Sequence, residues 1–150
     1  MLIAVAFTSA SAIALTWWIP QLVRLIRVGD SGVSAGTWAM YAASAGVWGL
    51  WALLEQSWVF GTIQTLETVG IVAVVLLLRA WRLFIALCAA ISVLLLLAVL
   101  GGEALIGVTG IAVTASSRIP QIKKAFVEPD IRGVSGSAWL VGLVGNVSWI

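Results

Sequence analysis

The sequence predicts an all-α membrane protein made of two parallel three-helix bundles joined by one linking helix. Three observations predict this fold class. The chain has 150 residues, of which 62% are hydrophobic and 9% are charged. Long apolar blocks follow one another along the chain, and two distant segments repeat one motif. Soluble domains carry about 25% charged residues, so these few charges cannot cover a water-exposed surface.

Six apolar blocks predict the transmembrane helices, because a helix needs roughly 20 apolar residues to cross a bilayer. The blocks are residues 2–19, 38–54, 59–78, 83–100, 104–119 and 138–150. The first has no basic residues before it, so we interpret it as a helix rather than a signal peptide. The last is short and ends without a cap or turn signal. We therefore expect a chain cut off within its sixth helix; the alternative is a short chain that forms a homo-oligomer.

The basic residues predict the orientation of these helices. All of them lie in the linkers after the first, third and fifth blocks: Arg24, Arg27, Arg79, Arg82, Arg118, Lys123, Lys124 and Arg132. The loops on the opposite side contain only Glu55 and Glu103 as charged residues. Because cytoplasmic loops are enriched in Lys and Arg, we expect a multi-pass protein of the cell (plasma) membrane with its N-terminus outside.

Composition also excludes several function classes. The chain contains no histidine and a single cysteine, Cys88, which excludes His-based catalysis, most zinc sites and an internal disulfide. The net charge of +2 is too small to indicate nucleic-acid binding. No nucleophile–base pair or metal cluster is visible, so we predict no enzyme activity, no metal and no cofactor.

Two segments of the chain repeat the same motif. Ile-Pro-Gln at residues 19–21 recurs at 119–121, and Gly-Val-Ser at residues 32–34 recurs at 133–135. In the same register two tryptophan pairs match, Trp38 with Trp139 and Trp48 with Trp149. Agreement of this kind indicates a duplication.

The duplication divides the chain into a first three-helix unit (residues 1–80), a linking helix (81–101) and an incomplete second unit (102–150). One extra crossing between two odd-numbered units returns the chain to its starting side. Both units therefore point the same way through the membrane, an architecture known among transporters.

The repeated prolines, Pro20 and Pro120, lie inside helical patterns. Proline removes one backbone donor and presses against the carbonyl four residues earlier, at Thr16 and Ser116. The hydroxyls of these residues can resettle the local hydrogen bonding of a bent helix. Two interpretations stay open, a hinge used in alternating access and a fixed kink needed for packing.

The neighbouring repeated residues have structural interpretations. Gln21 and Gln121 are expected to form hydrogen bonds between helices rather than to a transported solute, since an unpaired amide in lipid is costly. Gly32 and Gly133 would allow a turn, and Ser34 and Ser135 would cap the helices that follow.

The third apolar block carries an unusual polar face. Four residues fall at i, i+3, i+4 and i+7, with Glu67 beside them: Gly61, Gln64, Thr65 and Thr68. Glu67 is expected near the middle of the bilayer, where an ionisable side chain indicates function. It could accept hydrogen bonds from a polyol or carry a proton; the alternative is an acid bonded to another helix for structure.

The tryptophans fall into two groups. Six lie near block ends and are expected to anchor the chain at the membrane interface: Trp17, Trp18, Trp38, Trp58, Trp81 and Trp139. Trp48, Trp51 and Trp149 lie within blocks. Trp48 and Trp149 are also related by the repeat, so their flat faces could enclose a sugar ring. Asn146 shares a helix face with Trp149. Packing is the alternative role for both tryptophans.

The two Ile-Pro-Gln segments, each followed by a basic loop and Gly-Val-Ser-x-x-x-Trp, resemble the PQ-loop repeats. The layout of three helices, one linking helix and three helices resembles the SWEET sugar transporters, over nearly the whole chain. The resemblance implies a passive or proton-linked carrier that rocks two bundles around a central sugar site. In that family a Trp and an Asn from each repeat line the pocket. Trp48, Trp149 and Asn146 match this pattern, whereas Gln64 stands nearest to the asparagine that the third helix lacks.

Together these observations predict a membrane transporter of a small neutral solute, a mono- or disaccharide being favoured. Its substrate-binding residues would be Trp48, Gln64, Glu67, Asn146 and Trp149, with the two Pro-Gln pairs as hinges. A proton-coupled amino-acid carrier, with Glu67 as the coupling acid, is one alternative. A non-transporting receptor or scaffold of the same fold is the other.

Overall fold

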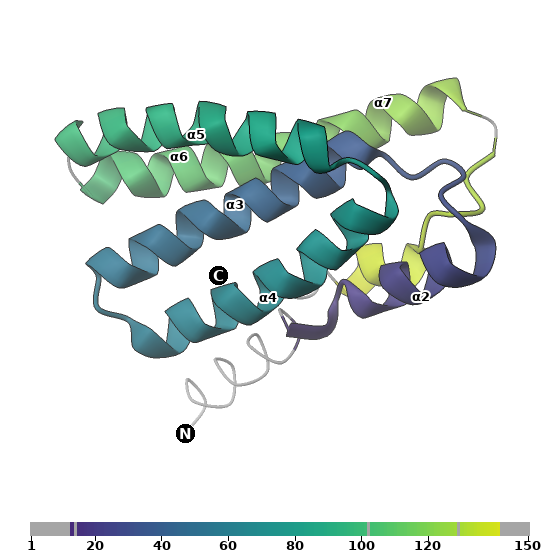
Figure 1. Cartoon of the computed structure of the whole chain (residues 1–150), viewed down its shortest axis with the longest axis horizontal. Helices are drawn as coiled ribbons and strands as arrows, with labels where there is room; N and C mark the ends of the chain where they lie inside the picture. Colours follow the sequence, from purple (N-terminus) through teal and green to yellow (C-terminus); the bar gives the residue numbers. More distant parts are fainter. Residues whose placement is uncertain (1–12, 14, 102, 129, 142–150) are drawn as a thin grey trace.

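The computed structural model describes residues 13, 15–101, 103–128 and 130–141, and most of these are helical (Figure 1). The helices are α2 (Ile19–Val28), α3 (Ala35–Leu54), α4 (Trp58–Leu77), α5 (Trp81–Gly101), α6 (Glu103–Ser116) and α7 (Ile119–Val127). Residues 136–141 begin a further helix. No strand occurs in the described ranges, so the predicted all-α class is confirmed.

Side-chain caps start the helices that follow the two Gly-Val-Ser motifs. The Ser34 hydroxyl accepts a hydrogen bond from the Thr37 backbone N–H (3.3 Å) at the start of α3. The Ser135 hydroxyl accepts the equivalent bond from Ala138 (3.2 Å). Both predicted caps are therefore confirmed, because each hydroxyl satisfies an N–H that the first helical turn leaves unpaired.

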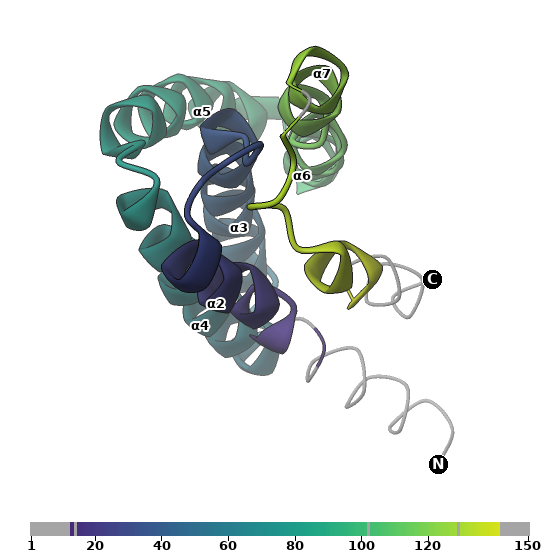
Figure 2. The same ribbon diagram turned by 90° about the vertical axis from the view of Figure 1, so that its right-hand side faces the viewer.

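Helix α3 lies at the centre of the bundle, with α4 on one side and the antiparallel pair α5 and α6 on the other (Figures 1 and 2). It contributes to both apolar cores. Trp38 packs with the α4 residues Ile71 and Val74, whereas Val47 packs with Ile91 of α5 and Ile106 of α6. Several buried residues of α3 are alanines. Their small side chains let α4, α5 and α6 pack closely against α3 without leaving voids.

The outward faces of α4, α5 and α6 are apolar. Large side chains that are more than half exposed recur along them, among them Leu66, Val69, Ile85, Val108 and Ile111. Among the helices in the described ranges, α4 combines the length and hydropathy that crossing a membrane requires. An apolar exterior of this extent indicates a surface that contacts something other than water.

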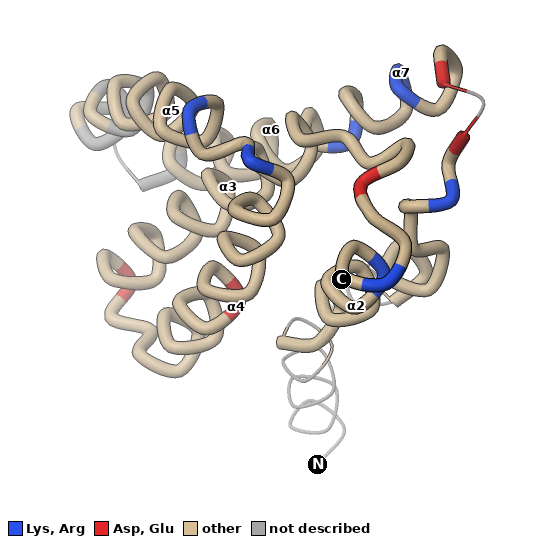
Figure 3. The backbone as a smooth tube through the Cα atoms, turned by 45° about the vertical axis from the view of Figure 1, so that its right-hand side comes forward, with Lys and Arg blue, Asp and Glu red and all other residues tan. Residues whose placement is uncertain are grey.

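The basic side chains lie at one end of the bundle, together with Asp30, Glu128 and Asp130 (Figure 3). The basic residues gather around the end of α2, the α4–α5 turn and α7 (Figure 3). Glu55 follows the last residue of α3, at the opposite end of that helix. The loops that the sequence assigns to one side therefore share one end of the structure.

Both Ile-Pro-Gln helices are interrupted at equivalent places. Residues 17–18 form a turn before α2, and residues 117–118 form one between α6 and α7. Trp18 (φ −78°, ψ −20°) and Arg118 (φ −81°, ψ −23°) have nearly the same backbone angles. The expected kink is thus a two-residue break, with each proline in the first turn of the new helix, where its missing N–H removes no helical bond.

Candidate functional site at the junction of the Ile-Pro-Gln segments

The Gln21 side chain joins the first Ile-Pro-Gln segment to the second Gly-Val-Ser loop. Gln21 is only 1% exposed. Its Nε2 donates to the carbonyl of Gly133 (2.8 Å), and its Oε1 accepts from the N–H of Ser135 (2.9 Å). One amide therefore satisfies two buried backbone groups that lie more than 110 residues away along the chain.

Gln121 makes the reverse connection. It is 6% exposed, its Nε2 donates to the carbonyl of Gly32 (2.8 Å), and its Oε1 accepts from the N–H of Ser34 (2.7 Å). We call these two side chains and their four backbone partners the glutamine clamp. The glutamines bond inside the protein, as predicted, but their partners are loop backbone groups and not other helices.

The two loops of the glutamine clamp also contact each other directly (Figures 1 and 2). The N–H of Gly133 donates to the carbonyl of Ser31 (2.8 Å). A Cβ atom on Gly133 would overlap that same carbonyl, and one on Gly32 would overlap the backbone of Asp130. Gly32 also has a φ of +72°. The two glycines are thus required by close approach of the loops and, at Gly32, by the turn itself.

Basic side chains reinforce the contact from both sides. Nε of Arg24 donates to the carbonyl of Arg132, and Nζ of Lys124 donates to the carbonyl of Val33 (2.9 Å). Arg24 and Lys124 are themselves related by a shift of 100 residues. Each segment therefore binds the loop of the other through a glutamine and a cation.

Glu67 of α4 lies beside an aromatic cluster. Its carboxylate accepts a hydrogen bond from Nε1 of Trp17 (2.6 Å). The Trp17 ring stacks on Trp38 (centroids 5.3 Å apart, planes 16° apart) and meets Tyr41 edge-on at 5.0 Å. The Tyr41 hydroxyl in turn accepts from Nε of Arg118 (3.2 Å), so the cluster links the turn before α2 with α3, α4 and the start of α7.

This cluster corrects part of the tryptophan assignment. Trp17 and Trp38 were expected at the membrane interface, but Trp38 is buried and Trp17 bonds inward to Glu67. The carboxylate supplies a partner for the indole N–H, which a lipid environment would leave unpaired. Trp58, at 73% exposed, and Trp81 do lie on the surface at helix starts.

Trp48 lies between α3 and α6. Its Nε1 donates to the hydroxyl of Thr114 (3.1 Å), which also bonds to the hydroxyl of Ser44 (2.6 Å). The indole passes close to Gly110, where an added Cβ would lie 3.1 Å from the ring, and it meets Trp51 edge-on at 5.9 Å. Trp48 therefore occupies the contact between the first unit and α6, held by both a hydrogen bond and packing.

Gln64 has a different environment from the glutamines of the clamp. It is 8% exposed, yet its side-chain amide forms no hydrogen bond with any residue that the structure describes. By contrast, Nε1 of Trp18 and the Thr37 hydroxyl are fully buried and have no partner there. The amide atoms of Gln64 are not among these fully buried groups, so this amide keeps some exposure although the residue as a whole is buried.

The remaining predicted site residues, Asn146 and Trp149, lie outside the described residues. Thr114, Tyr41 and Trp17 were not predicted to bond site residues, and their hydrogen bonds are seen only in the structure. A hydroxyl within an apolar block was the one sequence signal that could have indicated Thr114. No group of three His, Cys, Asp or Glu side chains suited to a metal occurs in the described part of the chain.

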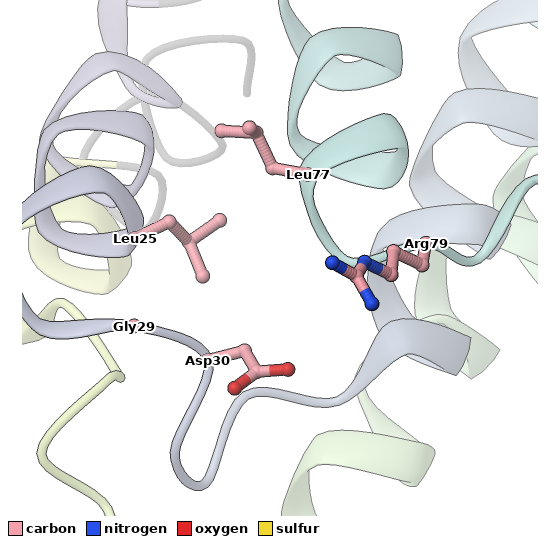
Figure 4. Close-up of a pocket in the computed structure, with 5 residues that line it drawn as sticks. All are labelled: Leu25, Gly29, Asp30, Leu77 and Arg79. Carbon is pink, nitrogen blue, oxygen red and sulfur yellow. The ribbon is translucent and has the colours of Figure 1, made fainter.

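Two surface pockets lie at the basic end of the bundle. One, of about 390 Å³, has Leu25 and Leu77 on its walls, and the Asp30 carboxylate and Arg79 guanidinium point into it (Figure 4). The other, of about 330 Å³, lies between α2 and residues 135–137. Trp48, Gln64 and Glu67 line neither pocket.

Comparison of the chain with models of known protein families, with curated protein sequences and with solved structures found no match.

Proposed function

We propose that the chain is a membrane transporter that carries a small neutral solute by alternating access, with a mono- or disaccharide as the favoured cargo. The glutamine clamp carries the proposal. Two helices break at equivalent positions, and the part after each break is bound to the loop of the other segment. A tilt at one break would therefore pull on the other segment, which suits a carrier that rocks two similar halves around one site.

The distribution of apolar and charged residues supports a multi-pass protein. Exposed apolar side chains cover α4, α5 and α6, and basic residues gather at one end of the bundle. By the positive-inside rule that end would face the cytoplasm of the cell membrane, with the N-terminus outside.

The solute would be bound by Trp48 and Gln64, with Asn146 and Trp149 from the second half. An indole offers a flat surface to the C–H face of a sugar, and an amide can both donate to and accept from its hydroxyls. Gln64 supports this role, because its amide makes no hydrogen bond with the described residues and keeps some exposure, so a solute hydroxyl could bind it.

Uptake of labelled glucose and sucrose into liposomes that contain the purified protein tests this proposal. We expect uptake above that of protein-free liposomes, saturable and independent of a pH gradient. Gln64→Leu should reduce uptake at least about tenfold while the protein stays folded, since each lost hydrogen bond to a bound polyol costs about 1–1.5 kcal/mol. Thr62→Val, on an exposed part of the same helix, is the matched control and should transport normally. If neither sugar enters, the sugar-carrier proposal is wrong.

A proton-coupled amino-acid carrier is the second candidate, and the Glu67–Trp17 hydrogen bond favours it. The Glu67 carboxylate accepts a hydrogen bond from the Trp17 indole. If Trp17 moved away during transport, the carboxyl group could bind a proton, and it could release that proton when Trp17 returned. Uptake of lysine and arginine that requires an acidic exterior, and that Glu67→Gln abolishes, would support this candidate. Glu55→Gln, at the exposed end of α3, should leave it unchanged. If no solute of either class moves, a receptor or scaffold remains.

A further inference from the structure

The pocket between α2 and residues 135–137 combines a basic rim with apolar walls. It has a volume of about 330 Å³, and Arg24, Arg27 and Ser137 are among the polar residues that line it. Its walls include Ile19, Val23 and Val28, each between 39% and 48% exposed. One side of α2 thus presents an apolar strip that ends in two cations.

The lining carries positive charge without a compensating acid. Arg24 is held in place by its hydrogen bond to the Arg132 carbonyl. Arg27 is exposed, and its guanidinium makes no hydrogen bond or ion pair with the described residues. Asp130, an acid on the adjacent loop, is already paired with Arg132 at 2.8 Å. Arg27 is therefore available to an anion from outside the chain.

We propose that this pocket binds the headgroup of an anionic phospholipid, with the phosphate on Arg27 and the acyl chain along Ile19 and Val23. A guanidinium binds phosphate oxygens in a bidentate manner, and basic pockets between helices at the cytoplasmic side suit such headgroups. An inorganic anion would use the cations but not the apolar walls. The proposal rests on the membrane location given above and not on transport.

The test compares phosphatidylglycerol with phosphatidylcholine of the same acyl chains. The purified full chain in neutral detergent is given an equimolar mixture of the two lipids, and native mass spectrometry counts the lipids that stay bound. We expect phosphatidylglycerol to be preferred about fivefold, the effect of one basic residue near an anionic surface. Arg27→Gln should bring the ratio close to one, and Arg27→Lys should retain most of the preference.

Arg82→Gln is the matched control, because Arg82 is another exposed arginine at the same end and lies outside the pocket. It should leave the preference unchanged. An equal loss in both glutamine variants would show diffuse attraction by the basic end and overturn the proposal. Displacement of the lipid by millimolar inorganic phosphate would overturn it as well, in favour of a site for a free anion. Sugar uptake by Arg27→Gln is a separate measurement, so a failed transport proposal does not alter this result.

Discussion

The two Ile-Pro-Gln segments differ less in their backbone than in their surroundings. Both break before the Ile-Pro pair with nearly equal backbone angles, and both send a glutamine to the opposite loop with bonds of 2.7–2.9 Å. The residues shared by the segments are those that make these contacts. Each copy of the motif supplies a glutamine amide and a Gly-Val-Ser loop. Two copies are therefore sufficient to form hydrogen bonds in both directions between the segments.

The two Ile-Pro-Gln segments have different contacts at the residues that they do not share. In the first, Trp17 bonds to Glu67, and Trp18 lies against Gly70 of α4. In the second, Arg118 bonds to Tyr41 and lies over the Trp139 ring (5.9 Å). The first break is therefore packed into an aromatic interior, whereas the second is held through a cation. We expect the first segment to be the more rigid of the two.

The largest effect is expected where both loops are disturbed at once. Gly133→Ala places a Cβ on the Ser31 carbonyl, and Gly32→Ala adds backbone strain to a similar overlap. Each should lower the free energy of unfolding by about 3 kcal/mol or more. Denaturation in detergent, followed by circular dichroism, measures the loss. Gly136→Ala, where an added Cβ meets nothing within 4 Å, is the control and should keep full stability.

Removal of either clamp glutamine should have the next largest effect. Gln21→Leu and Gln121→Leu each leave a buried carbonyl and a buried N–H without partners, which costs about 2–3 kcal/mol. Equal losses are expected if the connection is reciprocal. Gln64→Leu removes an amide that bonds to no described residue and should not lower the same unfolding free energy. A much smaller loss in one clamp variant would contradict the equivalence of the two segments.

The difference between the segments can be tested at the first break. Trp17→Phe keeps an aromatic ring beside Trp38 but removes the N–H that Glu67 accepts, so we expect a loss of about 1–2 kcal/mol. Trp58→Phe changes an exposed ring and should have no measurable effect. Unfolding followed by tryptophan fluorescence reports both variants. Equal stability of the two would show that the aromatic interior does not depend on this bond.

The smallest effect is expected at the surface of the second loop. The Arg132 side chain, with help from Ser31, holds the pKa of Asp130 below its usual range. A lowered folded-state pKa contributes stability above the unfolded value, near pH 4, and that contribution disappears as the pH falls further. Asp130→Asn should therefore be slightly less stable at pH 7, and the difference should vanish in acid. Asp30→Asn is the control, since that side chain forms no bond within the described residues.

Local patterns predicted much of the secondary structure. The apolar blocks correspond to α3, α4, α5 and α6 within a few residues at each end. The Gly-Val-Ser motifs start helices with the expected serine caps. Helix positions and caps depend on residues within one or two helical turns of each other. They can therefore be predicted from the sequence without knowledge of the tertiary contacts.

The partners of individual side chains could not be predicted in this way. The position of Trp17 at a block end predicts a membrane interface, but the fold provides it with the Glu67 carboxylate fifty residues away. The sequence predicts a solute as the partner of Trp48, and the structure adds a hydrogen bond to Thr114. Hydropathy distinguishes apolar from polar positions, and it cannot tell which of several hydroxyls or acids a buried N–H will meet.

The amino-acid order alone determined that the chain is helical, where its helices are capped, that its cations share one end, and that a Pro-Gln motif occurs twice. Only the tertiary structure decided that each motif bonds to the loop of the other and that Gln64 remains without a partner among the described residues. The physical reason is the distance along the chain between the groups that interact. Helix formation and capping are satisfied by near neighbours, whereas a buried amide is satisfied by whichever backbone the packed fold brings to it.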